Sequence, residues 1–184
     1  ILMAQPCPGR YITPGLIKKY MKAPNLPYDT MFHLVERHFS VLRNIQKNYV
    51  TIFSEKGLAA FIQNGILQDL PPQYVPPLEP SDVKMMLTEL YKETENGTIT
   101  SLIVRPTVLQ IPEYLSIYAT SQAGLHLYTT NSFVFGAYSS DIHISDISLC
   151  KVFTDFFAGL SGSPMVYSKE ETLCLLKQYI SLIP

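Results

Sequence analysis

Residues 68–82 read QDLPPQYVPPLEPSD, and five of the chain's 14 prolines fall between Pro71 and Pro80. Such a stretch can be a solvated linker, a ligand for a proline-reading domain, or a strap packed between two parts of a fold. PPQYVPP contains no P-x-x-P with a nearby basic residue, which argues against a proline-domain ligand. The stretch is too apolar for a free linker, because it also carries Leu70, Tyr74, Val75 and Leu78. We therefore expect a strap at 68–80 that joins an N-terminal helical segment, 1–67, to an α/β effector domain, 81–184.

The composition of the 184 residues is that of a folded domain, with 47% hydrophobic and 16% charged residues. No run of about 18 apolar residues occurs, so we expect no membrane span. The first residues, ILMAQPCPGRY, lack the charged start and apolar run of a signal peptide. Cys7, Cys150 and Cys174 form no close pair, which is typical of reduced thiols in a cytoplasmic protein. Because the sequence starts at Ile1, we expect it to be a fragment of a longer chain.

Charge is unevenly distributed along the chain. Residues 1–56 hold eight Lys or Arg and three acidic residues, a net charge of +5. Residues 57–184 hold six Lys or Arg and twelve acidic residues, a net charge of −6, and the two sums recover the overall −1. The positive charge of residues 1–56 is consistent with a position near an acidic partner. Ordinary variation of surface charge is the alternative interpretation.

Helical periodicity dominates the first half of the chain. Residues 28–50 have apolar residues near helical spacing with charged residues opposite them, and they predict an amphipathic helix. A second helix is expected in SEKGLAAFIQNG, with Ser54 as its N-cap and Gly65 as its C-terminal stop. After the strap, Ser81 or Asp82 is expected to cap a third helix.

Asn96-Gly97 ends this third helix, and the pattern then changes to the alternation typical of strands. TITSLIVRP predicts a strand, LSIYAT and LHLYTT predict a hairpin, and SFVFGAYS predicts a further strand. In the hairpin, Tyr118, His126 and Tyr128 are expected to share one face of the sheet and the apolar residues the other. The expected fold is α+β, with N-terminal helices, a small mostly antiparallel sheet of three to five strands, and two C-terminal helices packed on it.

Two segments predict the C-terminal helices. Ser168-Lys-Glu-Glu171 matches the S-x-x-E capping box and predicts the start of the last helix. The helix before it is expected in ISLCKVFTDFFAGL. Its apolar side chains, expected to face inward, are Leu149, Val152, Phe153, Phe156, Phe157 and Leu160.

Motifs for catalysis and metal binding fail on spacing. His33 and His38 lie five residues apart, off the i, i+4 face that a helical zinc site needs. No C-x-x-C, G-x-G-x-x-G or Walker loop occurs, so we expect no metal and no cofactor. Asp141 and His143 could pair on a strand, although an edge or loop histidine is the ordinary interpretation. We therefore expect that the chain is not an enzyme, and an enzyme using Asp141 and His143 is the third hypothesis.

One positive feature is a group of aromatic and polar residues in the expected sheet. Tyr118, His126 and Tyr128, with Arg105 near a strand end, have the composition of a small-ligand pocket. Packing under helices, or a subunit interface, is the alternative explanation for the same aromatic residues. These four residues are the predicted ligand-binding site.

Three long segments carry a resemblance to a known family: LPPQYVPPLEPSDVKMMLTELYKET, LQIPEYLSIYAT and VYSKEETLCLLKQYI. Over roughly residues 28–182, the chain resembles the region that follows the DNA-binding domain in Xre-like helix-turn-helix regulators of Gram-positive gut bacteria. The resemblance implies a sensor or effector domain, also dimerising, whose DNA-reading part lies upstream and is absent here. The layout is also similar to phospholipase-D-like sensor domains. The enzymatic motif H-x-K-x4-D is missing, because Leu127 and Tyr128 follow His126.

The main hypothesis is a non-enzymatic regulatory domain of a transcription regulator. It would form a homodimer, bind a small molecule or peptide effector, and touch DNA only through the upstream domain. Helix 28–50 is the expected transmitter, because it is amphipathic and stands next to the absent DNA-binding part. A ligand-free dimerisation and scaffold module is the second hypothesis.

Overall fold

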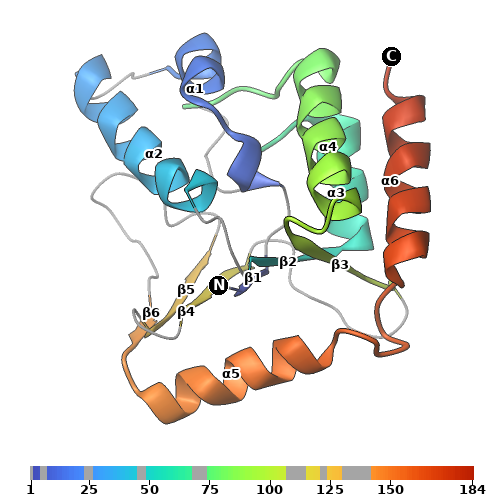
Figure 1. Ribbon diagram of the computed structural model, residues 1–184. Helices are drawn as coiled ribbons and strands as arrows, with labels where there is room; N and C mark the ends of the chain where they lie inside the picture. Colours follow the sequence, from blue (N-terminus) through green and yellow to red (C-terminus); the bar gives the residue numbers. More distant parts are fainter. Residues whose placement is uncertain are drawn as a thin grey trace.

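The computed structural model describes residues 2–4, 8–22, 27–44, 49–67, 74–106, 115–120, 124–129 and 142–184. These residues form six α-helices, one 3-10 turn and six strands (Figure 1). In chain order the elements are β1 (Leu2–Ala4), η1 (Gly9–Tyr11), α1 (Pro14–Tyr20), α2 (Tyr28–Arg43), β2 (Val50–Ser54), α3 (Glu55–Asn64), α4 (Pro80–Glu95), β3 (Thr100–Val104), β4 (Leu115–Thr120), β5 (Gly124–Thr129), β6 (Ile142–Ile144), α5 (Ile147–Gly159) and α6 (Lys169–Leu182). The α+β class expected from the sequence is confirmed. Within these residues, no helix is long and apolar enough to cross a membrane.

The sheet differs from the one expected. Its strand order is β3-β2-β1-β4-β5-β6, with β1, β2 and β3 parallel and β4, β5 and β6 joined antiparallel. A small, mostly antiparallel sheet of three to five strands was therefore the wrong prediction. The missed strands, β1 and β2, lie in the part of the chain expected to be helical. The further strand expected in SFVFGAYS lies outside the described residues.

Burial on both faces explains why β2 left no strand pattern in the sequence. Thr51, Ile52 and Phe53 are consecutive and all buried. Strands of a parallel sheet that is covered on both sides show an apolar run rather than alternation. β1 has only three residues, too few to establish any period.

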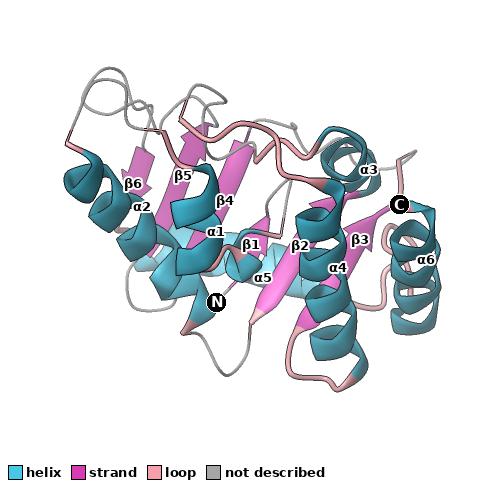
Figure 2. Ribbon diagram, turned by 90° about the horizontal axis from the view of Figure 1, so that it is seen from above, coloured by secondary structure: helices cyan, strands magenta, loops and turns pink. Residues whose placement is uncertain are grey.

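The helices form two layers on the sheet. Phe53 of β2 and Ile103 of β3 belong to one hydrophobic core with residues of α1, α2, α3, α4 and α6. Figure 1 shows α1 to α4 on one side of the sheet and α5 on the other, where α5 contacts β4 and β5. α6 contacts α4 and β3. Figure 2 shows the sheet strands running beneath α1, α2 and α4 when seen from above.

Several helix ends follow the expected capping chemistry. The Ser54 hydroxyl accepts a hydrogen bond from Gly57 N at 2.9 Å, and Gly65 ends α3 in the left-handed region. The capping box between Ser168 and Glu171 is present in both directions. The expected cap of α4, Ser81 or Asp82, was wrong by two or three residues: the N-cap is Glu79, and α4 begins at Pro80, which is pre-organised for the first helical position.

Residues 74–79 are the described part of the expected strap, and they are packed into the fold. Tyr74, Val75 and Leu78 are buried in the same core as the helices. Lys22 N donates to Tyr74 O at 2.6 Å, and Leu78 N donates to Gly65 O at 2.8 Å. The segments expected at 1–67 and 81–184 therefore share one sheet and one core, and this strap lies between them.

Two helices differ in detail from their sequence patterns. α2 ends at Arg43 rather than near 50, and among its described side chains Met31, Val35 and Phe39 are buried. α5 does not bury its whole apolar set. Among its described side chains Cys150 is buried, as is Leu160 just after the helix, whereas Leu149, Val152 and Phe156 are exposed, so the prediction that these three face inward was wrong. A helix that is apolar on most sides has no single face that periodicity can assign to the core.

Candidate functional site

The register of the hairpin places three of the four predicted ligand residues on one face of the sheet. Tyr118 on β4 lies opposite His126 on β5, and Ser116 lies opposite Tyr128. Because partners in a ladder share a face and faces alternate along a strand, Tyr118, His126 and Tyr128 occupy the same side, as expected. The structure describes the backbone of these strands and not their side chains.

The four other strands extend this face into a row that crosses the whole sheet. His143 on β6 lies opposite His126, and Met3 on β1 lies opposite Tyr118. Met3 is in turn aligned with Thr51 on β2, and Thr51 with Ser101 on β3. We call the residues Ser101, Thr51, Met3, Tyr118, His126 and His143 the cross-sheet row.

The described end of the cross-sheet row identifies which side of the sheet it occupies. Ser101 Oγ and Thr94 Oγ1 of α4 are 2.8 Å apart, so the row lies on the side covered by α1 to α4. Thr51 and Ser101 are only 1% and 5% exposed. Apart from Thr129, the alternate positions of β4 and β5 are apolar, and they belong to the side that α5 contacts. Apart from Met3, the row thus consists of residues with polar groups, on the side of the sheet where α1 to α4 lie.

Sequence reasoning placed Tyr118 beside His126 but missed His143, its partner on the other side. His143 is 17 residues further along the chain (143 − 126), and it was noted only as a partner for Asp141, which lies outside the described residues. Thr51 and Ser101 carried no signal, because isolated hydroxyl residues in apolar runs are common. The alternation Ile-His-Ile at 142–144 was the one available hint that His143 occupies the opposite face from its neighbours.

Arg105, the fourth predicted ligand residue, is not brought to the others. It follows β3, which is separated from β4 by β2 and β1, a distance of about 14 Å at the usual strand spacing. Its Nη2 donates to both carboxylate oxygens of Glu171, at 2.9 and 2.8 Å, and its guanidinium lies 4.1 Å from the centre of the Tyr167 ring. Arg105 therefore ties the end of β3 to the start of α6.

The electrostatics of this corner agree with a structural role. The backbone N–H of Ser168 and then Arg105 lower the pKa of Glu171. Tyr167 Oη donates to Glu55 Oε2 at 2.7 Å, and this bond, with burial, raises the pKa of Tyr167. Glu55 opens α3, so the corner joins β3, α3 and α6.

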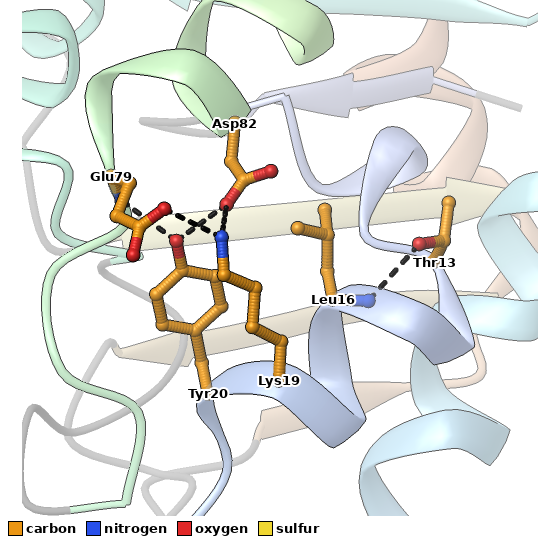
Figure 3. A network of polar contacts seen from close by, with 6 residues as sticks. All are labelled: Thr13, Leu16, Lys19, Tyr20, Glu79 and Asp82. Carbon is orange, nitrogen blue, oxygen red and sulfur yellow. Dashed lines mark hydrogen bonds and ion pairs between the residues drawn. The ribbon is translucent and has the colours of Figure 1, made fainter.

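A second ionic cluster joins α1 to the beginning of α4 (Figure 3). Lys19 Nζ donates to Glu79 Oε2 at 2.6 Å and to Asp82 Oδ2 at 2.8 Å. Tyr20 Oη donates to Asp82 Oδ2 at 2.5 Å and accepts from Glu79 N at 2.9 Å. The hydrogen bonds to Asp82 and Glu79 raise the pKa of Lys19, so its amine stays protonated. A protonated amine is neither a nucleophile nor a base, and this cluster acts as a clamp.

A third cluster is more deeply buried. Arg10, 7% exposed, donates through Nε to Glu93 Oε2 at 2.9 Å, and Tyr11 Oη donates to the same oxygen at 2.8 Å. The Arg10 guanidinium also lies 5.1 Å from the centre of the Tyr49 ring. Burial, and then the bond to Glu93, raise the pKa of Tyr11. This cluster anchors η1 on the last turns of α4.

Comparison with family models, with curated proteins and with solved structures gave no match. Among the side chains that the structure describes, no three His, Cys, Asp or Glu residues come together as metal ligands. The three ionic clusters hold elements of the fold together. The cross-sheet row is therefore the candidate functional site.

Proposed function

We propose that this chain is a non-enzymatic regulatory domain of a cytoplasmic transcription regulator, whose effector binds over the β4–β6 end of the cross-sheet row. The observation that carries the proposal is the register that aligns Tyr118, His126 and His143 on the helix-covered side of the sheet. A phenol and two imidazoles provide aromatic surface together with hydrogen-bonding groups, the composition of a small-molecule site.

The hydrogen-bonding capacity of the residues in the row favours an effector with polar groups. A polar group covered by helices without a hydrogen-bond partner costs roughly 1–3 kcal/mol, so proteins supply a partner or a ligand. At the β3 end of the row, the protein supplies the partner, because Ser101 meets Thr94. At the β4–β6 end, an effector with polar groups would meet a sheet face whose aligned positions hold a phenol and two imidazoles. Tyr128, two residues from His126 on the same face, would add a second aromatic surface.

Helix α2 is the element that would respond to the effector. Figures 1 and 2 both show α2 on the same side of the sheet as the row and above the β5–β6 end. Its ties to the rest of the fold include Met31, Val35 and Phe39 in the core and a hydrogen bond from Arg43 to the carbonyl of Ile12. An effector shifts α2 only if it binds one position of the helix more tightly than another. DNA would be reached through a domain upstream of this sequence.

Native mass spectrometry of the purified chain tests the proposal. We expect a retained small-molecule mass that is lost in Tyr118→Ala and His126→Ala and kept in His33→Ala. His33 is exposed on α2 and serves as the matched histidine control. Far-UV circular dichroism of each variant checks that it is folded. If all three variants retain the molecule equally, the effector binds elsewhere. If the wild-type chain binds no small molecule, even from a mixture of ligands, the proposal is contradicted.

A second candidate function, self-association, is favoured by a different observation on α5. Leu149, Val152 and Phe156 are 40%, 63% and 51% exposed and lie at i, i+3 and i+7, so they form one apolar stripe. Exposed apolar patches mark interaction surfaces. Val152 lies near the middle of the stripe, so two copies packed antiparallel would set Leu149 of each close to Phe156 of the other, as an isologous dimer requires.

Sedimentation equilibrium distinguishes this second candidate from the first. Val152→Asp is expected to convert a dimer to a monomer, whereas Ala158→Asp, the same change on the opposite side of α5, should leave the dimer intact. A wild-type chain that is monomeric at all concentrations would exclude self-association through α5. Either result leaves effector binding to be decided by the mass measurement.

A further inference from the structure

We propose that the surface formed by α1 and the first turns of α2 binds single-stranded nucleic acid, with bases stacked on exposed aromatic rings and phosphates held by lysines. The inference goes beyond the proposed function, because it assigns a second binding surface that shares no residue with the cross-sheet row. The observation that carries it is a pair of stacked rings, Tyr28 and Phe32, with the amine of Lys18 over the Phe32 ring.

The aromatic rings of α2 form a platform at the surface. Tyr28 and Phe32 are one helical turn apart, and their ring centres are 6.4 Å apart with planes inclined by 12°, a stacked arrangement. The ring of His33, an exposed residue, meets the Phe32 ring edge-on at 5.9 Å. Phe32 is half-buried and packs against the core, whereas Tyr28 is 42% exposed. A ring that is already held in place offers a stacking surface to a base at a small cost in side-chain entropy.

The cations near this platform are not neutralised by the protein. Lys18 Nζ lies 5.4 Å from the centre of the Phe32 ring. Lys22 follows α1, four residues after Lys18, and Arg37 lies one turn after His33 on α2; all three basic residues are exposed. Within the described part of the chain, none of the three has a carboxylate partner. By contrast, the basic residues of this half that are held in ion pairs are Arg10, Lys19 and Arg43.

The carboxylates of the same two helices leave the surface positive. Of the two acidic residues described on α1 and α2, Glu36 is paired with Arg43, and Asp29 is exposed. Three unpaired cations against one exposed carboxylate give a local charge of +2. The positive charge that the sequence places in residues 1–56 is therefore available to an outside partner on this surface.

The rings decide which acidic partner fits best. Positive charge alone attracts an acidic peptide, a duplex and a single strand alike. Exposed aromatic rings add affinity only for a partner with flat rings to stack on them, and every nucleobase has such a face. The bases of a duplex are stacked on one another, whereas those of a single strand are free. Lysine and aromatic residues side by side are thus suited to a single strand.

Fluorescence anisotropy with a labelled oligothymidine about 20 nucleotides long tests the surface, with the full 184-residue chain as the protein. We expect Tyr28→Ala to weaken binding at least about fivefold, because a stacked base is lost. Tyr28→Trp should keep the affinity within about twofold of wild type, since it preserves a stacking ring. Tyr28 is exposed, so thermal melts of both variants should stay close to that of the wild-type chain.

Salt dependence identifies the phosphate contacts. For single strands, the slope of log affinity against log salt concentration changes by about 0.7 for each phosphate that a protein cation neutralises. Lys18→Gln should therefore reduce the slope by about 0.7, whereas Lys56→Gln, the same change at an exposed lysine of α3, should leave it unchanged. Figures 1 and 2 both show α3 beside α4 and away from α2. A lysine with only a structural role would change the Tm and not the slope.

Three results would overturn the inference. They are no binding of oligothymidine by the wild-type chain at low salt, equal affinity for a duplex of the same length, and equal weakening by Lys56→Gln and Lys18→Gln. The outcome is also independent of the effector. Tyr118→Ala, which should lose a retained effector mass, should bind oligothymidine like the wild-type chain, so either proposal can fail while the other stands.

Discussion

Gly65→Ala tests how tightly the strap is held against α3. Gly65 has φ 66°, a left-handed conformation that side chains other than glycine rarely adopt. A Cβ added at this position would lie within 3.0 Å of both the N and the O of Leu78. The contact is with backbone, so it cannot be relieved by rotating a side chain. Leu78 N also donates to Gly65 O at 2.8 Å, so any movement apart breaks this bond.

The expected cost has three parts. An alanine in the left-handed region costs about 1 kcal/mol. Loss of the hydrogen bond between Leu78 and Gly65 costs about 1 kcal/mol. Partial exposure of Leu78, now buried in the core, costs a further 1–2 kcal/mol or so, at roughly 25 cal/mol per Å² of apolar surface. We therefore expect Gly65→Ala to lower the free energy of unfolding by about 3–4 kcal/mol.

The matched control is Gly97→Ala. Gly97 has φ 73°, almost the same conformation, but a Cβ there would meet no atom within 4 Å. Its expected cost is therefore the backbone term alone, about 1 kcal/mol. Urea denaturation of both variants measures the difference, expected to be about 2–3 kcal/mol in favour of Gly97→Ala. Equal losses of stability in the two variants would refute the close packing of the strap on α3.

Three further predictions concern the ionic clusters. Glu93→Gln should lower stability by about 2–4 kcal/mol in urea denaturation, because it weakens the acceptor of buried Arg10, whereas Glu89→Gln on the exposed side of α4 should cost under about 0.5 kcal/mol. Burial alone would raise the pKa of Asp82, but hydrogen bonds from Lys19 and Tyr20 outweigh it and lower the pKa. A lowered pKa adds stability that is present above the usual value of 3.8 and is lost as pH falls through the folded value. Asp82→Asn should therefore reduce the dependence of Tm on pH between pH 5 and pH 2, and an unchanged dependence would contradict the clamp. Arg105→Gln should change the urea midpoint only slightly, because its ion pair with Glu171 is exposed, and should leave any retained effector mass unchanged; loss of that mass would place Arg105 in the ligand site.

Local chemistry made part of the fold predictable. The caps at Ser54 and Ser168 and the stop at Gly65 depend on residues within one helical turn, and all three are present. The hairpin between β4 and β5 has strict alternation because its two faces meet different layers, so Tyr118 and His126 were correctly placed on one face.

The missed features depend on contacts distant in sequence. β2 is buried on both faces, and that burial removed the alternation that marks a strand. Its parallel partner β3 begins about 50 residues later in the chain, at Thr100, so no local sequence pattern predicts that the two strands pair. The exposed side of α5 could not be predicted from the sequence, because apolar residues lie on most sides of that helix.

The sequence predicted only the part of the candidate site whose residues are close together along the chain. Tyr118 and His126 are close in sequence and could be grouped by alternation, whereas His143 joins them only through the β5–β6 register. Arg105 was grouped with them because it follows a strand, but the strand order puts that strand at the opposite edge of the sheet. Charge and strand position alone do not reveal the order of strands.

The cross-sheet row underlies the proposed function, and cross-strand nuclear Overhauser effects test it most directly. In the labelled wild-type chain, backbone protons of His126 should show effects to His143 on one side and to Tyr118 on the other. Clear effects from His126 to other partners in their place would mean a different register. A register shifted by one residue moves a histidine to the face that α5 contacts, and the effector site would then be lost.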